Sequence, residues 1–380
     1  MRPKIARPTG IRAVVLLALG SVLLAACGTT PATHHSAAHH STHASAPPTG
    51  NPSSQVTLNE AGSTLIYPYL QVLAPEFNSA FSNATLAPGP GGSGLGINDA
   101  IGKLVQMGGS DAYLSPALAA ANPTLLNIPI AISSQAVNYN VPGAPDFLKL
   151  SGNLLAQMYE GKITNWNDPK IAALNPGVTL PNLAVVPVRR LDSSGDTFIF
   201  TSYLTATNSA WSSGPNEGTT VTWPPVSNEL TANGNPAMIE TCHGTPGCIA
   251  YIGVSVEDTA IETGLQEAKI ENKSGSFLTP DQTDVTAAVA AAAGSTPSDL
   301  RQSLIYSPGT NSYPIVNFEY LMIQEHQSDS ATAQAIRTFL DWAISPTGGA
   351  TSGNLSAVNF VALPTLVIPK VETAINKITG

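Results

Sequence analysis

Charged side chains are scarce in this chain. Only 11% of its 380 residues are charged, and the 16 Lys and Arg are scattered along the sequence rather than grouped. Nucleic-acid binding depends on a basic patch, which a chain of formal net charge −9 with scattered cations does not offer. We therefore expect no nucleic-acid partner. The hydrophobic fraction of 43% and the length are sufficient for two globular lobes with a sizeable core.

Residues that could act as catalytic bases are also few. After His43 the only histidines are His243 and His326, so a His base for a Ser nucleophile is hard to assemble. Leu95 stands where a nucleophile elbow at Ser93 would need Gly, and no Ser is followed three residues later by Lys. We expect a binding protein that has no catalytic residues and no cofactor. A secreted phosphatase is the alternative.

The N-terminus has the composition of an export signal. A basic stretch precedes an apolar run of 14 residues, Ala13 to Ala26, which is too short for a comfortable membrane span. The run ends in Leu24-Ala25-Ala26-Cys27, which resembles the lipobox of bacterial lipoproteins. The resemblance implies a signal peptide at 1–26 and a lipid-modified (palmitate-bearing) Cys27 that anchors the protein on the extracytoplasmic face of the cell membrane. An ordinary signal peptide with an incidental Cys is the alternative.

Residues 27–55 predict a flexible tether. They are rich in Ser, Thr, Ala, Pro and His and have almost no large apolar side chains, so they cannot bury a core. The histidines between His34 and His43 could bind a metal transiently, but a solvated linker accounts for them, and we expect no metal site. No later apolar run reaches the about 18 residues that a second membrane span needs.

Two cysteines follow the tether, Cys242 and Cys248. In an exported protein, such a pair is read first as a disulfide, which here would close a short loop. A metal site that includes His243 is the alternative, although three ligands on so short a loop lack a fourth.

From Gln55 onward, short strand-like runs alternate with amphipathic runs. This alternation predicts an α/β architecture with largely parallel sheets. The strand-like runs are Val56–Leu58, Ala84–Ala87, Leu125–Val141 and Ala184–Val188. The helix candidates are Leu65–Phe77, Ile97–Met107, Leu154–Tyr159, Asp168–Leu174, Phe198–Ala206 and Ala331–Ile344.

Three turns share one design, in which a strand is followed by small or hydroxyl-bearing residues and then by a helix. They are Gly62-Ser63-Thr64-Leu65, Gly92-Ser93-Gly94 and Ser194-Gly195-Asp196-Thr197. Each offers hydroxyls and free amides at a helix N-terminus, which favours an anion, although each hydroxyl by itself is typical of a helix cap. Gly89–Gly94 also matches a dinucleotide-binding pattern, but the match is isolated and Pro90 lies in the turn.

Carboxylates accompany these donors and narrow the choice of anion. Asp111 lies in the short turn Gly108–Ala112, and Arg190 precedes the third turn, which contains Asp196. The Arg fork supplies a charged donor. A carboxylate repels an anion unless the anion carries a proton to donate, so the pattern indicates phosphate, which retains a proton near neutral pH, rather than sulfate. A structural ion pair between Asp111 and Arg190 is the alternative.

The order of these motifs is similar to that of a known family. Together, Ala61-Gly-Ser-Thr64, Gly92-Ser-Gly94, Gly109-Ser-Asp-Ala112 and Arg190-x-Asp-x-Ser-Gly195 resemble the PstS-type phosphate-binding proteins of bacterial phosphate ABC importers, above all the lipoprotein versions of actinobacteria. The resemblance runs from about Gln55 to near the C-terminus. It implies a type II periplasmic-binding-protein fold, in which two α/β lobes joined by a two-segment hinge close on the ligand. Domain I would be 56–133 plus 315–380, and domain II would be 134–314.

The resemblance also implies a ligand set and partners. Asp111 would accept the phosphate's proton and pair with Arg190, while Asp196, which stands where the enterobacterial pattern has Thr, could be a second acceptor. The chain would be a monomer that delivers inorganic phosphate to ABC permease subunits, and a receptor for another oxyanion is the alternative. The phosphate ligands implied are Ser63, Thr64, Leu65, Ser93, Asp111, Arg190, Ser194, Gly195, Asp196 and Thr197.

Overall fold

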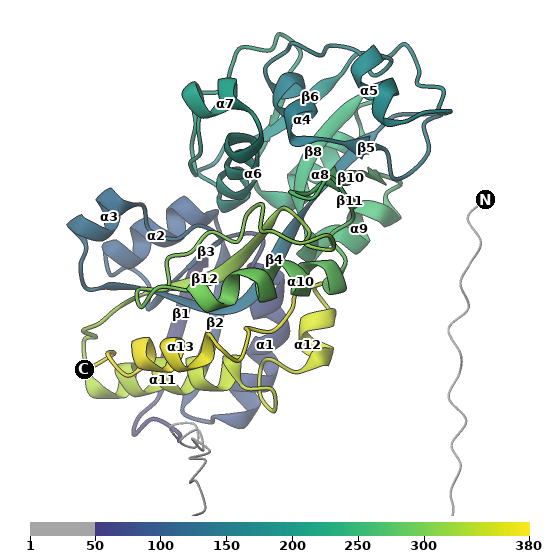
Figure 1. Cartoon of the computed structure of the whole chain (residues 1–380). Coiled ribbons are helices and arrows are strands. Elements are labelled where there is room, and N and C mark those ends of the chain that lie inside the picture. The colour runs from purple at the N-terminus through teal and green to yellow at the C-terminus, as the bar shows by residue number, and fades with distance from the viewer. Residues whose placement is uncertain (1–49) are drawn as a thin grey trace, which may run out of the picture. The chain divides into compact units, whose positions relative to one another are not determined.

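The structure is a computed structural model that describes residues 50–380 (Figure 1). The predicted signal peptide at 1–26, the lipidation site Cys27 and most of the predicted tether at 27–55 lie outside the described residues. In the described part of the chain, no helix combines the length and the apolar character that crossing a bilayer requires.

The main sheet has nine strands among the described residues. Their order across the sheet is β2-β1-β3-β12-β4-β8-β6-β7, and β9 pairs with β4 beside that path. The bounds of these strands are β1 Val56–Gly62, β2 Ala84–Pro90, β3 Met107–Ser110, β4 Leu125–Asn140, β6 Val186–Arg190, β7 Leu230–Ala232, β8 Cys248–Gly253, β9 Gln266–Glu267 and β12 Val316–Gln324. A small sheet of order β11-β10-β5 consists of β5 Lys149–Leu150, β10 Lys269–Glu271 and β11 Phe277–Leu278.

Helices connect most of the strands and cover the sheet (Figure 1). They are α1 Tyr67–Ala80, α2 Ser93–Ile101, α3 Pro116–Ala121, α4 Gly152–Tyr159, α5 Pro169–Leu174, α6 Gly195–Thr207, α7 Ser209–Ser213, α8 Gly234–His243, α9 Glu257–Glu262, α10 Gln282–Ala292, α11 Ser330–Ile344, α12 Ser352–Ser356 and α13 Ile368–Ile375, with the short 3₁₀ turns η1 Val254–Val256 and η2 Ala293–Ser295. The predicted α/β alternation is therefore present.

The centre of the main sheet is antiparallel. β1 runs parallel to β2 and β3, and β6 runs parallel to β7 and β8, as expected of strands joined through helices. However, β12 is antiparallel to both β3 and β4, and β4 is antiparallel to β8. The prediction of largely parallel sheets was wrong there, because these long strands join the two parallel groups without a helical crossover.

Strand β4 belongs to both halves of the sheet. Its residues Leu125–Ser134 pair with β12, and its residues Gln135–Asn140 pair with β8. Figure 1 shows this strand passing from the elements around β1 and β12 to those around β6 and β8. Continuous backbone pairing on both parts of one strand therefore couples the two groups of elements.

Several predicted helix bounds were wrong. The helix expected at Leu65–Phe77 is α1, which begins at Tyr67 with Ile66 as its N-cap. The helix expected at Ile97–Met107 is α2, which begins at Ser93 and ends at Ile101. Gly102 follows, Lys103 adopts a left-handed φ of 55°, and Met107 already belongs to β3. The earlier start matters for the site, because it places Ser93 in the first turn of α2.

Aromatic side chains fill the core on both sides of β4. Phe77 of α1 packs against Phe339 and Trp342 of α11, with ring centroids 5.1 Å and 5.5 Å away. In the other half, Phe200 of α6 stacks on Tyr251 of β8 at 4.5 Å. Burial of such large side chains contributes about 1.5–3 kcal/mol each, so the helices that start at the site are held firmly against the sheet.

The predicted domain boundaries at 133/134 and 314/315 stay a prediction. The change of partner along β4 occurs between Ser134 and Gln135. The segment after α9 has contacts on the side of β12, because Gln282 Nε2 donates to Phe360 O at 2.7 Å and Tyr320 Oη donates to Leu300 O at 2.9 Å.

Candidate functional site

Five residues of the candidate site lie at or after the carboxyl ends of four strands. Ser63 comes directly after β1, Asp111 directly after β3, and Arg190 is the last residue of β6. Ser93 opens α2 after β2, and Ser194 is the N-cap of α6. In open α/β sheets, ligands bind outside the carboxyl ends of the strands, and helix N-termini there favour anions. The topology thus gathers the three predicted turns, Asp111 and Arg190 at one place.

Asp111 lies at the centre of this group, with 1% of its surface exposed. The Ser63 hydroxyl donates to Asp111 Oδ1, and the Ser93 hydroxyl lies 3.2 Å from Oδ2. Ser93 Oγ also accepts from the Asp111 amide at 3.1 Å. The carboxylate therefore faces hydroxyls from two of the three predicted turns.

The third turn reaches the same point through Gly195. A Cβ atom on Gly195 would lie 2.4 Å from both Asp111 Oδ2 and Ser93 Oγ. In addition, the Gly94 amide donates to Ser193 O at 2.9 Å. The loops that follow β2, β3 and β6 are therefore in direct contact, and the absence of a side chain at Gly195 is one condition for this approach.

Arg190 pairs with two aspartates of its own loop. Its Nη1 lies 2.6 Å from Asp196 Oδ2, its Nε lies 2.7 Å from Asp192 Oδ1, and its Nη2 contacts Asp192 Oδ2. The predicted direct pair between Arg190 and Asp111 was wrong. Asp192 and Asp196 thus engage all three nitrogens of the planar guanidinium, each nitrogen through one contact.

Asp196 is held by more donors than sequence reasoning foresaw. Asn235 Nδ2 donates to its Oδ2 at 2.9 Å, and Gln135 Nε2 donates to its Oδ1 at 3.2 Å. Sequence reasoning missed both amides. Asn235 follows Gly234 and precedes Pro236 at the start of α8, which is a recognisable helix-start signal, whereas nothing distinguishes Gln135 within the strand β4. Asp196 thus anchors Arg190 to the scaffold.

The other predicted ligands have protein partners in the structure. The main-chain amide of Leu65 donates to Ser63 Oγ at 2.9 Å, and Thr64 Oγ1 accepts from the main-chain amide of Asn235 at 3.2 Å. Ser194 Oγ accepts from the Thr197 amide at 3.4 Å, which is the capping role considered as the alternative for each hydroxyl. The Thr197 hydroxyl lies 2.8 Å from the Tyr251 hydroxyl, another residue that sequence reasoning missed.

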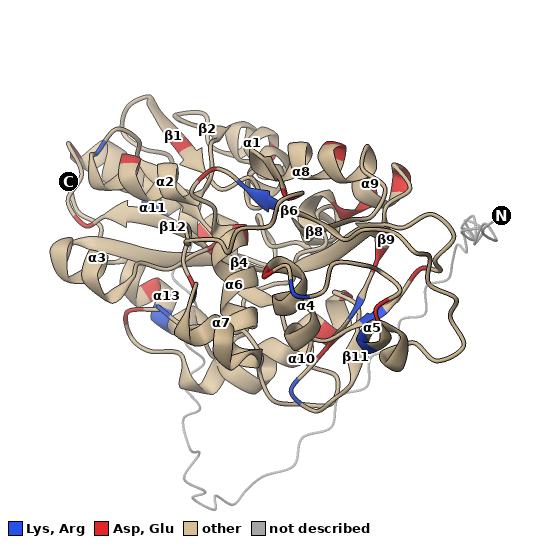
Figure 2. Cartoon of the chain, turned by 90° about the horizontal axis from the view of Figure 1, so that it is seen from above, with Lys and Arg blue, Asp and Glu red and all other residues tan. Residues whose placement is uncertain are grey.

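Burial sets the charges of the site. It raises the pKa of Asp111 to about 7, with the negative charge of Asp196 acting in the same direction and Arg190 in the other. Burial also raises the pKa of Asp196, and Arg190 and Asn235 oppose that rise. Burial alone would lower the pKa of Arg190, but hydrogen bonds and charges from Asp192 and Asp196 raise it, so the guanidinium stays charged. In Figure 2 the blue end of β6 lies beside red segments, while the other Lys and Arg are dispersed.

This arrangement combines hydroxyl and amide donors, one guanidinium and one central carboxylate. Such donors stabilise the bare oxygens of an anion, and the carboxylate can accept a proton that the anion still carries. Among the described residues, no three His, Cys, Asp or Glu side chains converge as metal ligands do.

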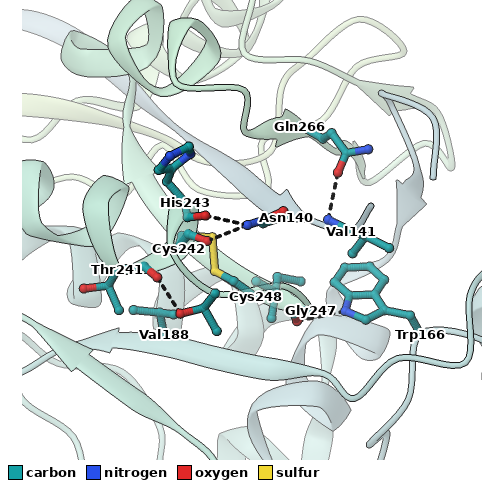
Figure 3. Close-up of a disulfide and its surroundings, with 12 residues drawn as sticks. Asn140, Val141, Trp166, Val188, Thr241, Cys242, His243, Gly247, Cys248 and Gln266 are labelled. Carbon is teal, nitrogen blue, oxygen red and sulfur yellow. Dashed lines mark hydrogen bonds between the residues drawn. A yellow bond between two sulfur atoms is a disulfide. The ribbon is translucent and has the colours of Figure 1, made fainter. Parts of the chain in front are cut away.

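The two cysteines form a disulfide, as predicted. Cys242 at the end of α8 is bonded to Cys248 at the start of β8, with their Cα atoms 5.3 Å apart (Figure 3). Asn140 Nδ2 donates to Cys242 O at 3.1 Å and to His243 O at 2.7 Å. The disulfide therefore fixes the C-terminal end of α8, the helix whose first turn supplies Asn235 to the site.

Comparisons with known proteins identify relatives that match most of the chain. A family model described as a PBP superfamily domain matches residues 41–347. The phosphate-binding protein PstS of Methanocaldococcus jannaschii is 32% identical over 87% of this chain and 90% of its own length. PstS3 of Mycobacterium bovis is 31% identical over 96% of this chain and 98% of its own length.

A solved structure extends the comparison to three dimensions. The phosphate-binding protein from Stenotrophomonas maltophilia superimposes with a TM-score of 0.63 at 19% identity, covering 84% of this chain and 94% of that chain. At this level of identity the likeness concerns the fold alone. It confirms the predicted α/β periplasmic-binding-protein fold.

Proposed function

The chain belongs to the PstS family of phosphate-binding proteins, and on that premise we propose that it captures inorganic phosphate outside the cytoplasm and delivers it to an ABC permease. The observation that carries the proposal is the buried Asp111 carboxylate, which faces the hydroxyls of Ser63 and Ser93 at the carboxyl ends of the strands. A site of this kind suits an oxyanion that is still partly protonated.

In the proposed complex the donors turn from their present partners to the ligand. The hydroxyls of Ser63 and Ser93, which now face Asp111, would donate to phosphate oxygens, with further donors from the turns at Thr64, Leu65 and Ser194–Thr197. Asp111 would accept a hydrogen bond from the protonated oxygen of the phosphate. Arg190 would supply positive charge from its fixed position, and Asp196 would hold Arg190 in place rather than act as a second acceptor.

Discrimination against sulfate follows from the same carboxylate. An ionised Asp111 accepts a hydrogen bond from the O–H of phosphate. Sulfate has no proton to donate, so a sulfate oxygen in the same place would be repelled by the carboxylate. Sites built to hydrogen-bond a hydroxyl reject analogues that lack it by roughly 10⁴–10⁵-fold. Neither of the two relatives is named as an enzyme, so the secreted phosphatase gains no support from them.

We also propose that the protein is exported and lipid-anchored and that its two domains close on the ligand. Export by the signal peptide at 1–26, lipidation of Cys27 and a tether over 27–55 would keep the binding unit near the permease, as a monomer with phosphate as its only small ligand. Domain I, 56–133 plus 315–380, and domain II, 134–314, would close on phosphate. Strand β4, which pairs with β12 and then with β8, is a natural hinge segment.

The test is a calorimetric titration of the purified chain with phosphate, sulfate and arsenate at pH 8. We expect tight binding of one phosphate per chain, comparable binding of arsenate, and negligible binding of sulfate. Equal affinity for phosphate and sulfate would contradict the proposed role of Asp111, and the absence of any phosphate binding would contradict the proposed function.

A further inference from the structure

Glu319 is a fully buried carboxyl in the middle of an apolar strand. It lies in β12, where its neighbours Phe318 and Tyr320 are also buried, and it has 0% exposure. No Lys or Arg forms an ion pair with Glu319 in the part of the chain that the structure describes. Burying an ionised carboxylate without a cation is very costly, so a neutral, protonated Glu319 is favoured.

Two uncharged polar side chains, Asn317 and Ser133, surround the Oε1 atom of Glu319. Asn317 Nδ2 lies 3.0 Å from Glu319 Oε1, and the Ser133 hydroxyl of β4 contacts the same oxygen. Ser133 also lies 2.8 Å from Asn317 Oδ1, and Asn317 Nδ2 lies 3.3 Å from the Asp111 carbonyl. The other carboxyl oxygen of Glu319, Oε2, is buried and accepts no hydrogen bond from Asn317 or Ser133.

On its other side, Glu319 faces Asp111, because the antiparallel register of β12 and β3 pairs Tyr320 with Ser110 and so places Glu319 opposite Asp111, while Glu319 Oε2 is buried without another partner. Two carboxyls can share a hydrogen bond only if one of them carries a proton. Burial first, and then the charge of Asp111, raise the pKa of Glu319 well above its usual value, whereas the contact with Glu319 lowers that of Asp111. Glu319 is therefore the donor and Asp111 the acceptor.

We propose that Glu319 is a positioning residue for the ligand: its neutral carboxyl donates a hydrogen bond to Asp111 from behind the site and keeps Asp111 an ionised acceptor for the proton of phosphate. The inference rests on the proposed function and adds to it a residue that does not touch the ligand. A hydrogen bond to the charged form of a group favours that form. Glu319 thereby offsets the effect of burial and of Asp196 on Asp111, in the same direction as Ser63 and Arg190.

The proposal predicts the pH range over which the site prefers phosphate to sulfate. While Asp111 is ionised, it rejects sulfate. Once Asp111 is protonated, it can donate to a sulfate oxygen, and the rejection is lost. Removing the donor of Glu319 should therefore make the loss of sulfate rejection begin at a higher pH.

The experiment compares Glu319→Gln with Glu319→Met in the full binding unit. The Gln amide keeps a donor toward Asp111 and the same net charge as a neutral Glu, whereas Met keeps the volume but has no donor. Dissociation constants for phosphate and for sulfate are measured from pH 5.5 to pH 9. We expect Glu319→Gln to retain the wild-type pH profile. For Glu319→Met we expect phosphate binding to weaken about tenfold at pH 7, and the midpoint of sulfate rejection to move up by about one pH unit.

Two outcomes would overturn the proposal. One is a Glu319→Met protein in which the pH midpoint of sulfate rejection is the same as in wild type. The other is a Glu319→Gln protein whose midpoint moves strongly to lower pH, because this would mean that Glu319 carries a negative charge next to Asp111. The second outcome decides the question even if Glu319→Met does not fold.

An infrared spectrum separates failure of this inference from failure of the proposed function. A protonated buried carboxyl has a C=O band distinct from that of carboxylates. Burial raises the pKa of Glu60 to about 8 and that of Glu267 to about 9, so these residues also contribute to the band at pH 8, and we expect Glu319→Gln to reduce the wild-type band rather than remove it. If wild type does not bind phosphate, the proposed function fails while the band still tests Glu319. If wild type binds phosphate but Glu319→Gln leaves the band unchanged, only the role of Glu319 fails.

Discussion

Gly195 touches Asp111 so closely that any side chain would collide with the carboxylate. A Cβ atom there would lie 2.4 Å from Asp111 Oδ2 and 2.6 Å from its Cβ. Gly195 begins α6, and Asp111 follows β3, so the contact joins two loops that are far apart in sequence. Contact between these loops is therefore sensitive to a single methyl group.

We expect Gly195→Ala to weaken phosphate binding by at least about a hundredfold, since well-packed sites tolerate overpacking poorly. The added methyl would push α6 away from Asp111 and Ser93 and hold the loops apart. Calorimetry would give the affinity, and small-angle scattering would show whether phosphate still compacts the protein. Gly294→Ala is the matched control, because a Cβ at Gly294 meets nothing within 4 Å. Equal affinities of the two variants would argue against this steric account.

Asp111→Asn should relax selectivity rather than abolish binding. The amide can donate to a sulfate oxygen, so we expect the preference for phosphate over sulfate to fall by at least about a hundredfold. In wild type, Asp111 becomes protonated as the pH falls through about 7, and the preference should decline over the same range. In Asp111→Asn the preference should no longer depend on pH in this way. Competition titrations at pH 5.5 and pH 8.5 measure both effects.

Arg190→Lys should weaken phosphate binding by about tenfold or more. An ammonium group cannot meet Asp192 and Asp196 at once in the planar geometry of the guanidinium. The neighbouring Arg189→Lys is the control, because Arg189 makes a single, partly exposed pair with Glu229 at 2.7 Å. We expect the control to bind phosphate as wild type does, and similar losses in both variants would contradict a special role for Arg190.

The stability of the protein should fall as the pH rises from about 5 to about 8. Burial raises the pKa of Glu60 to about 8 in the folded protein, from its ordinary value of 4.5. Between these values the folded state holds a proton that the unfolded state has released, so the free energy of unfolding decreases with rising pH. Glu60→Gln removes this contribution, and its melting temperature should depend less on pH. Thermal unfolding at pH 5.5 and pH 8.5, without phosphate, provides the comparison.

Replacing both Cys242 and Cys248 with Ser should lower the free energy of unfolding by about 2–3 kcal/mol, the value of a short closed loop in the chain-entropy model. The bond joins α8 to β8, and α8 carries Asn235 to Asp196 at its other end. We expect phosphate affinity to change less than about threefold, because Asn235 is also held by its contact with Gly253. Chemical denaturation and calorimetry measure the two quantities. A large loss of affinity at unchanged stability would show a direct role in binding.

Local patterns were enough to predict most elements and the placement of the three turns. Ser63, Ser93 and Ser194 each lie between a strand and the helix that follows it, where small and hydroxyl-bearing residues tolerate tight turns. Ser194 caps α6, Ser93 opens α2, and Ser63 Oγ accepts from the Leu65 amide ahead of α1. Glu319 also has a local signal, since a carboxylate inside the apolar run Val316–Ile323 is unexpected. Sequence reasoning did not use that signal.

The partners across the site could not be predicted from spacing. Asp196 is bonded to Gln135 and Asn235, which are 61 and 39 residues away in the chain. Such contacts depend on the order and direction of strands, and the antiparallel centre formed by β4 and β12 was not apparent from local composition. The expected pair between Asp111 and Arg190 failed for a different, local reason: the carboxylates of Asp192 and Asp196, close to Arg190 in the sequence, compete for the guanidinium.

Because β4 is hydrogen-bonded along its first part to β12 and along its last part to β8, the two halves of the sheet share a strand instead of being joined by a loop. Expressing the halves as separate polypeptides would leave each with an unpaired edge, which promotes aggregation. Circular permutants or inserted reporter domains should instead open the chain at an exposed turn, such as the one at Gly264, where nothing lies within 4 Å of an added Cβ.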